Sequence, residues 1–482
     1  MKERTSLVKN SIYNVIYKLL NVFFPLISST YVSHVLTATG VGKVTSAQNI
    51  AQYFVLIAAL GIPNYGTREI ARVLDKQDKT NKLFSELFFL NFISTMICSI
   101  AYYILIANLQ YFSSQISLYA IAGLAIVFNI INVDWYYQGS EEFKFIAIRG
   151  CIVKILSLIG LFIFVRSPKD CSVYALIYVL AIAGNYLFNI FNLRKRNVKL
   201  VYKKIDIVKH IKPVGILLCT VIAIELYTLL DTTMISYFCE PENVAYYTNS
   251  VQIVRILITT VSAIGGVLLP RLSYYRVQGL DSKCGEIVSQ IFHIMLFIFL
   301  PSGIGLMMTA NCIMPVLFGN SFTASVLTLR LASILVYALG FSNLFGTQVL
   351  LTFDKEKNLF LCTLVGAVSN IVMNYILIPK FQQNGAVIAS IISETLVTVL
   401  SLYFARKCIK IKLEKNMILT MIFATVIMAV GIYMVSLVTQ GCSLVIELVL
   451  EVIIGIVIYI FINKILKNPL LKFCNELIRR KK

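Results

Sequence analysis

Long apolar segments recur along the whole chain, and they constrain its fold more than any other feature. Fourteen can be recognised in the 482 residues, most of them close to the roughly 20 residues that a helix needs to cross a bilayer. Backbone in lipid must satisfy its own hydrogen bonds, so the segments are predicted to be helices. They cover residues 10–33, 41–62, 85–107, 115–137, 145–165, 172–192, 213–237, 247–269, 286–309, 325–350, 357–378, 385–405, 416–437 and 443–463.

The composition supports an all-α polytopic membrane protein. Hydrophobic residues make up 58% of the chain and charged residues 14%, whereas soluble domains are about 25% charged. This excludes a soluble globular protein and a disordered one. The connecting segments are short, which leaves no room for a large catalytic domain outside the membrane.

Basic residues are distributed unevenly between alternate loops. If the N-terminus is cytoplasmic, 35 Lys and Arg residues lie on the cytoplasmic side and three on the other side. Cytoplasmic loops of membrane proteins collect Lys and Arg, so the sequence predicts fourteen spans with both termini in the cytoplasm. The same rule accounts for most of the net charge of +20 without a nucleic-acid partner.

Catalytic and metal-binding patterns are missing from the sequence. The eleven cysteines form no Cys-x-x-Cys pair, and the three histidines are far apart, so no metal site is predicted. No Ser–His or His–Asp arrangement suggests catalysis. We therefore expect a protein that is not an enzyme and has no cofactor, while coupling to a proton or sodium gradient stays open.

A weak internal repeat divides the chain. Pro63 and Pro270 follow the second and eighth segments, each with an arginine close behind, and a charged run follows the fourth and tenth. Two six-helix units in the same orientation would produce this pattern, although loops can share such residues by chance. The predicted organisation is a six-helix bundle at 1–198, a basic linker at 199–212, a second bundle at 213–408, and two added helices with a basic tail at 409–482.

Four runs carry a family resemblance: Tyr65–Glu69 (Tyr-Gly-Thr-Arg-Glu), Trp135–Gly139 (Trp-Tyr-Tyr-Gln-Gly), Leu230–Ser236 and Asn374–Lys380. From about residue 6 to residue 407 the sequence resembles the Wzx-type flippases for O-antigen and capsule repeat units. These belong to the multidrug/oligosaccharidyl-lipid/polysaccharide exporter superfamily.

The resemblance implies both a fold and a substrate. The fold would be two six-helix bundles in a V, alternating between inward-open and outward-open states in the bacterial inner membrane. The substrate would be a short oligosaccharide on undecaprenyl diphosphate, moved from the cytoplasmic to the outer leaflet. A glycan polymerase and a chain-length regulator are possible partners besides the bilayer.

Four basic residues fall within predicted spans. Charges inside a membrane are expensive and usually face a cavity or a partner, and a diphosphate requires cations. We expect a cationic cavity formed by Lys18, Lys154, Arg255 and Arg330. The alternatives are that these side chains extend to the membrane surface or pair with a carboxylate.

Acidic residues within spans are candidates for ion or proton coupling. They are Glu225, near the middle of its span, Asp231 and Glu394. A structural ion pair is equally compatible with Glu225. Glu447 and Glu451, one helical turn apart in the last segment, suggest packing or a contact with a partner.

Tyrosines near the spans could contact sugar rings, since each offers a flat apolar face and a hydroxyl; an interfacial aromatic belt is the alternative. The candidates are Tyr17, Tyr53, Tyr136 and Tyr227. The segment after Pro63 is interpreted as a cytoplasmic gate or hinge, or else as a short helix packed under the bundle. Its residues are Pro63, Tyr65, Arg68, Glu69 and Arg72.

Three other functions compete with a flippase. A cation-coupled drug exporter of the same superfamily would favour acidic cavity residues, and four buried bases argue against it. A membrane enzyme, such as a repeat-unit polymerase or an acyltransferase, lacks catalytic groups here, and polymerases of this pathway tend to have a large exterior loop. A scaffold that transports nothing is also compatible with the sequence.

Overall fold

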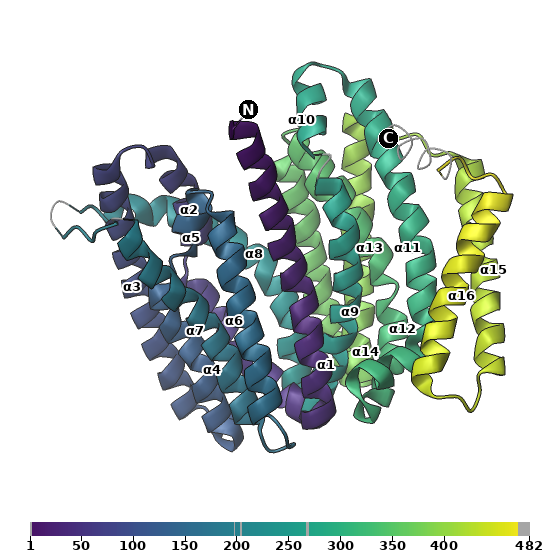
Figure 1. The fold of residues 1–482 in the computed structure, drawn as a ribbon, viewed down its shortest axis with the longest axis horizontal. Helices are drawn as coiled ribbons and strands as arrows, with labels where there is room; N and C mark the ends of the chain where they lie inside the picture. The colour runs from purple at the N-terminus through teal and green to yellow at the C-terminus, as the bar shows by residue number, and fades with distance from the viewer. Residues whose placement is uncertain (1, 197, 203–204, 267–268, 471–482) are drawn as a thin grey trace. The chain divides into compact units, whose positions relative to one another are not determined.

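The computed structural model describes the backbone of residues 2–196, 198–202, 205–266 and 269–470. Side chains are described from residue 23 onward, apart from residues 220, 223, 224, 226, 227 and 260–271 within helices. The described residues are helical or form short connections (Figure 1). This confirms the predicted all-α class.

Sixteen α-helices and four short segments of 3₁₀ or π-helix follow one another through the described residues. They are α1 (Lys2–Ala58), α2 (Ile62–Val73), α3 (Gln77–Asn108), η1 (Gln110–Gln115), α4 (Ile116–Phe128), η2 (Asn129–Ile131), α5 (Asp134–Gly139), α6 (Phe143–Phe164), α7 (Cys171–Lys195), α8 (Val208–Phe238), α9 (Pro241–Gly266), α10 (Leu269–Val277), α11 (Asp281–Phe318), η3 (Asn320–Ser325), α12 (Val326–Ala332), α13 (Leu335–Ser342), η4 (Asn343–Leu350), α14 (Glu356–Cys408), α15 (Lys415–Val438) and α16 (Leu444–Ile465).

The chain divides into two compact units, Met1–Ala245 and Tyr246–Lys482. Unit 1 holds α1 to α8, and unit 2 holds the rest of α9 and all later helices. Each unit is described by itself below. The linker predicted at residues 199–212 separates the two copies of the predicted repeat, which need not coincide with the two compact units. That boundary stays a prediction.

Among the described residues, nine helices are long and apolar enough to cross a membrane, or ten if the bent pair Asn320–Ala332 and Leu335–Leu350 forms one span. Two of the nine, Phe23–Val73 and Glu356–Cys408, each cover two predicted spans. The spans predicted at 213–237 and 247–269 fall on α8 and α9, whose side chains are only partly described. Each of the fourteen predicted segments thus overlaps at least one described helix, although some, such as 115–137, also contain short non-helical stretches.

The two longest helices each break at one residue. Thr37 interrupts α1 with a φ of 62°, and Gln382 interrupts α14 with a φ of 52°. The chain doubles back in α14, because a Cβ on Gly385 would lie 2.3 Å from the carbonyl oxygen of Leu377. In a straight helix those two residues would be about 12 Å apart along the axis.

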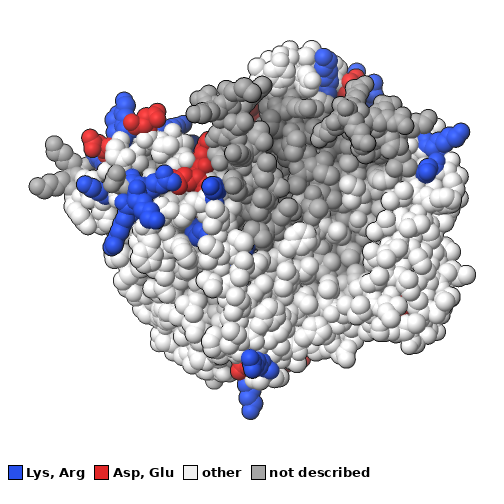
Figure 2. All heavy atoms as spheres, viewed as in Figure 1, with Lys and Arg blue, Asp and Glu red and all other residues white. Residues whose placement is uncertain are grey.

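Charged side chains gather at one end of unit 1. Figure 2 shows Lys and Arg clustered where α2 and the start of α3 lie in Figure 1. On the face that Figure 2 shows, few charged side chains interrupt the uncharged surface beyond this cluster. We call it the basic end of unit 1.

Candidate functional site: polar contacts along helix α8

Helices α2 and α5 interlock at the basic end of unit 1. They contain the Tyr65–Glu69 and Trp135–Gly139 runs that were singled out in the sequence. A Cβ on Gly66 would lie 2.7 Å from the Trp135 ring, and one on Gly139 would lie 2.7 Å from the carbonyl oxygen of Thr67. Each helix therefore has a glycine where the other approaches it, which is how small residues allow helices to pack closely. We call this pair of helices the collar.

An ion pair between buried Arg149 and partly exposed Asp134 joins the collar to α6 and α7. The Arg149 side chain is 2% exposed, and its Nη1 donates a hydrogen bond to Asp134 Oδ1 at 2.8 Å. Asn189 hydrogen-bonds to both of these side chains, and its backbone carbonyl accepts a bond from the Tyr137 hydroxyl at 2.7 Å. Leaving a buried charge such as that of Arg149 without its partner is strongly destabilising. Sequence analysis missed this network because its members are up to 55 residues apart.

Polar side chains connect the collar to the first turn of α8. The Tyr65 hydroxyl lies 2.8 Å from His210 Nδ1, and His210 Nε2 lies 3.0 Å from Glu86 Oε2. Since a carboxylate only accepts, Nε2 carries the hydrogen, and in a neutral ring Nδ1 accepts from Tyr65. Lys209 Nζ contacts the same carboxylate oxygen at 2.8 Å. We call these four residues the His210 latch.

The remaining predicted gate residues lie on the exposed side of α2. Glu69 Oε1 accepts from Arg68 Nε at 3.1 Å and from Arg72 Nη1 at 2.9 Å. The Arg68 guanidinium lies 5.6 Å from the centre of the Tyr65 ring, and Pro63 is in the first turn. The segment is therefore a short helix packed on the bundle, while its role as a gate stays a prediction.

A second group of polar contacts joins α1 to the other end of α8. Asn49 Nδ2 donates to Thr233 Oγ1 at 2.7 Å and to the Leu229 carbonyl oxygen at 3.3 Å. The Tyr53 and Thr233 hydroxyls are 2.9 Å apart, and Asp231 on the same stretch of α8 is buried. We call Asn49, Tyr53 and Thr233 the Thr233 latch.

The two latches lie roughly 35 Å apart along α8, given a rise of 1.5 Å per residue. Glu225 lies between them, with an exposed side chain whose Oε2 accepts a hydrogen bond from Thr228 at 3.4 Å. Hydrogen bonds can exchange partners with little net change in free energy. Helix α8 is thus joined to the rest of unit 1 by polar side chains at both of its ends.

The predicted cavity cations occupy different surroundings. Lys154 on α6 is half-buried and lies 5.6 Å from the centre of the Phe24 ring. Arg255 on α9 is exposed, and Arg330 at the end of α12 is half-buried. Among the described side chains, no carboxylate forms a salt bridge with Arg255 or Arg330. The Lys18 side chain lies outside the described residues.

The other predicted site residues are also separated. Glu394 is buried in α14, where its Oε2 accepts from Ser342 Oγ at 3.4 Å. Tyr136 is buried in the apolar core of the collar against Phe84, which leaves it no accessible face for a sugar. The side chains of Tyr17 and Tyr227 lie outside the described set.

The segments that follow α7 and α14 are held in the same way in the two units. In unit 1 the backbone N–H of Val201 donates to Ser85 Oγ at 2.7 Å, and in unit 2 that of Lys412 donates to Ser289 Oγ at 2.9 Å. Each serine also donates to the carbonyl oxygen four residues earlier in its helix, at 2.7 and 2.6 Å. We call the described parts of these segments, residues 198–202 with 205–207 and residues 409–414, the straps.

The straps extend the repeat beyond what was noticed in the sequence. Their serines are on α3 and α11, which follow the short helices α2 and α10. A matched pair of serines could have been found by aligning the two halves of the chain. The residues that donate to these serines could not have been found in this way, because they do so through backbone N–H groups, which every residue except proline has.

With the geometry described, comparison with known proteins becomes informative. The family model for "Polysaccharide biosynthesis protein" matches residues 7–276, more than half of the chain. The chain belongs to the polysaccharide biosynthesis protein family. This family membership confirms the resemblance seen in the sequence.

Two curated relatives support the assignment. The chain is 22% identical over 418 residues to the "Putative O-antigen transporter" of Escherichia coli K12, covering 84% of this chain and 97% of that protein. It is 21% identical over 238 residues to the "Probable low-salt glycan biosynthesis flippase Agl15" of Haloferax volcanii, covering 48% and 49% of the two chains. One of these relatives is named as a transporter and the other as a flippase, and neither as an enzyme. This chain is, like them, a multi-pass membrane protein.

Solved structures show the same fold. The lipid II flippase MurJ in an inward closed conformation superposes with a TM-score of 0.76 at 16% identity, covering 96% of this chain and all of the other. An inward-facing multidrug transporter of the MATE family gives 0.56 at 14% identity, covering 82% and 97%. The expected fold of this exporter superfamily is confirmed.

Proposed function

We propose that this protein moves oligosaccharides linked to undecaprenyl diphosphate from the cytoplasmic to the outer leaflet for surface polysaccharide synthesis. The observation that carries the proposal is the family match over residues 7–276, joined to a fold shared with a lipid II flippase. Both termini are then cytoplasmic in the bacterial inner membrane, and the basic end of unit 1 faces the cytoplasm.

Alternating access follows from the contacts of α8 in this proposal. The His210 latch closes the cytoplasmic end of α8 against the collar, and the Thr233 latch closes the opposite end against α1. A transport cycle would open them in turn. A polar latch suits this role because hydrogen bonds lost on opening are replaced by water, so neither state is strongly favoured.

The diphosphate would be bound by basic side chains inside the spans. Arg255 and Arg330 form no salt bridge with a described carboxylate, so their charges are available for phosphate. Lys154 and Lys18 remain proposed contributors from unit 1. Arginine suits bidentate phosphate contact, whereas lysine acts as a point charge.

Deletion of the gene tests the proposal directly. The deletion strain should accumulate lipid-linked repeat units on the cytoplasmic leaflet and lose its surface glycan. Restoration by the wild-type gene, but not by an Arg255→Ala/Arg330→Ala double variant at equal membrane abundance, would support the cation role. The matched control is Lys357→Ala/Arg406→Ala, which removes two exposed bases at the ends of α14 and should export glycan normally.

Two results would refute parts of this scheme. Unchanged leaflet distribution of lipid-linked repeat units in the deletion strain would overturn the flippase function. Normal glycan export by the double arginine variant would overturn only the cation role. Glu225→Gln tests ion coupling in the same strain, because glycan export by this variant should depend less on the proton or sodium gradient. If the dependence is unchanged, Asp231 and Glu394 are the next candidates.

A further inference from the structure

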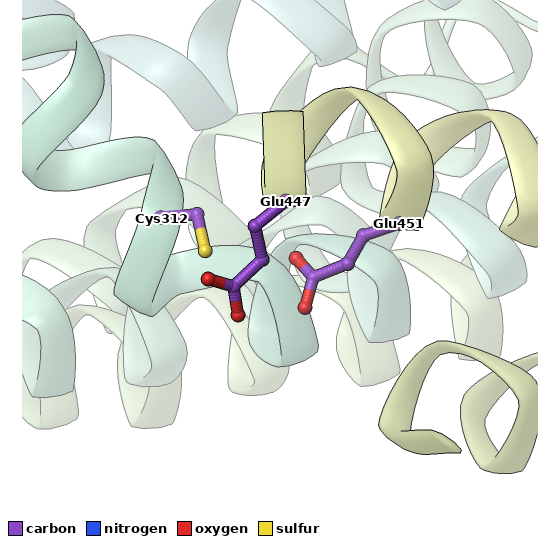
Figure 3. Close-up of side chains that lie close together, drawn as sticks. All are labelled: Cys312, Glu447 and Glu451. Carbon is purple, nitrogen blue, oxygen red and sulfur yellow. The ribbon is translucent and has the colours of Figure 1, made fainter. Parts of the chain in front are cut away.

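Three potential metal ligands meet within unit 2. Cys312 near the end of α11 and Glu447 and Glu451 on α16 each place one ligand atom within 4.8 Å of the other two. Figure 3 shows the three side chains pointing toward one another, with the thiol and the carboxylates on facing helices. Some 135 residues separate the cysteine from the glutamates, so the sequence alone gave no sign of the cluster.

Burial makes this cluster unusual. Cys312 and Glu451 are each 2% exposed, and Glu451 Oε2 has no hydrogen-bond partner among the described residues. A buried polar atom without a partner costs about 1–3 kcal/mol, and more when the group is charged. The Glu451 carboxylate that carries this unpaired oxygen belongs to the cluster of ligand atoms, so a bound cation or a proton there would offset the cost.

The charges of the two glutamates favour a positively charged ligand for this cluster. Glu447 and Glu451 are four residues apart on one helix, where like charges repel. Among the described side chains, no Lys, Arg or His forms a salt bridge with either. A cation or a shared proton must offset the repulsion between the two carboxylates.

We propose that Cys312, Glu447 and Glu451 bind a divalent transition-metal cation of the zinc type. Zn²⁺ accepts both thiolate sulfur and carboxylate oxygen, and three protein ligands leave a fourth position for water. The hard cations Ca²⁺ and Mg²⁺ prefer oxygen ligands alone, so the thiol argues against them. Binding forms the metal–sulfur bond and releases the thiol proton to solvent.

The site would fasten the last two helices to the rest of unit 2. Helices α15 and α16 form a hairpin beside α11 (Figure 1), and the Tyr459 hydroxyl already donates to the Phe297 carbonyl oxygen across α16 and α11 at 2.9 Å. The metal would add a second link near the start of α16. Half-buried Glu447, one turn from the connection between α15 and α16, provides the route of entry.

Metal content of the purified full-length protein tests the proposal. The protein is purified in detergent through a tag without histidine, stripped with a chelator, and dialysed against Zn²⁺ with a competing buffer. Wild-type protein should bind one Zn²⁺ per chain at this site. Cys312→Ser and Glu451→Gln should each weaken that binding roughly tenfold or more, comparable to the loss expected on disturbing a metal site. Two controls should leave it unchanged: Cys362→Ser, another buried cysteine in unit 2, and Glu286→Gln, an exposed glutamate on α11.

A spectroscopic measurement on the wild type covers the case in which Glu451→Gln fails to fold. Co²⁺ at the site should give a thiolate-to-metal charge-transfer band in the near ultraviolet, and Cys312→Ser, which is nearly isosteric, should abolish it. Wild-type protein that binds no metal, or that binds it equally well in both variants, would overturn the proposal. In the first case the two glutamates share a proton instead.

Discussion

The collar offers a sharp test of how the family motifs hold unit 1 together. Gly139→Ala would place a methyl group 2.7 Å from the carbonyl oxygen of Thr67 and 2.9 Å from Ile70 Cβ. The carbonyl belongs to the α2 backbone, so α5 has to move away. Overpacking of this kind costs about 1–3 kcal/mol, and the gain in helix propensity, up to about 1 kcal/mol, offsets part of it. The difference between the two terms is a net loss of roughly 0–3 kcal/mol in the free energy of unfolding, about 1.5 kcal/mol at its midpoint.

The chain supplies its own probe for this measurement. Trp135 is its single tryptophan, and it is 2% exposed within the collar. Fluorescence of the purified protein in detergent, titrated with a denaturing surfactant, therefore reports on this interface specifically. Gly139→Ala should lower the midpoint of the transition and shift the emission of the folded protein toward the red.

Glycines elsewhere in unit 1 provide matched controls with the opposite expected sign. A Cβ on Gly160 would meet Ile177 at 3.9 Å, and one on Gly184 would meet Val153 at 3.5 Å, both ordinary contacts. Alanine there should leave stability unchanged or raise it by up to about 1 kcal/mol. A Gly139→Ala protein as stable as these controls, with unshifted emission, would show that α2 and α5 do not interlock as described.

Further predictions concern the latch, the straps and a loop. Tyr65→Phe removes the hydroxyl that His210 Nδ1 contacts and should cost about 1–3 kcal/mol of unfolding free energy, measured by the same titration; an unchanged midpoint would remove this contact from the His210 latch. Ser85→Ala and Ser289→Ala should each speed hydrogen exchange of the backbone N–H groups in the strap of their own unit and leave the other strap unaffected. Faster exchange in both straps of a single variant would contradict this prediction. The pKa of Asp170 is lowered because its carboxylate accepts hydrogen bonds from backbone N–H groups of the α6–α7 loop. The Asp170 carboxylate should thus stabilise the fold above the ordinary aspartate pKa of about 3.9, and this stabilisation should disappear as pH falls through the lowered pKa. The unfolding midpoint, measured above and below these two pKa values, should therefore change less with pH in Asp170→Asn than in the wild type.

The sequence predicted the helices well because hydrophobic length and loop charge are local properties. Every predicted span overlaps a helix in the described residues, and the run after Pro63 forms the short helix that was one of two interpretations. The predicted segments also leave gaps at both helix breaks, between residues 33 and 41 and between residues 378 and 385. The residues that make the breaks, Thr37 and Gln382, could not be anticipated, because glycine is the usual residue at positive φ.

The candidate site was predicted less completely because it depends on distant pairs. Tyr65 was named as a gate residue, but its partner His210 is 145 residues away. Tyr53 was named for sugar contact, yet it hydrogen-bonds to Thr233 on α8. A charged residue inside a span costs free energy, but the sequence does not tell which neighbouring side chain offsets that cost. The grouping of Cys312 with two glutamates has the same explanation.

The straps bear on how a chain of this kind could have arisen. Ser85 and Ser289 each hold a segment of their own unit, so neither unit borrows a partner from the other to satisfy these N–H groups. A gene of half this length would already have encoded the helix and the segment that closes over it. Duplication would then have joined two parts whose strap contacts each form within one half. A later substitution in one half would not have disturbed the strap contact of the other half.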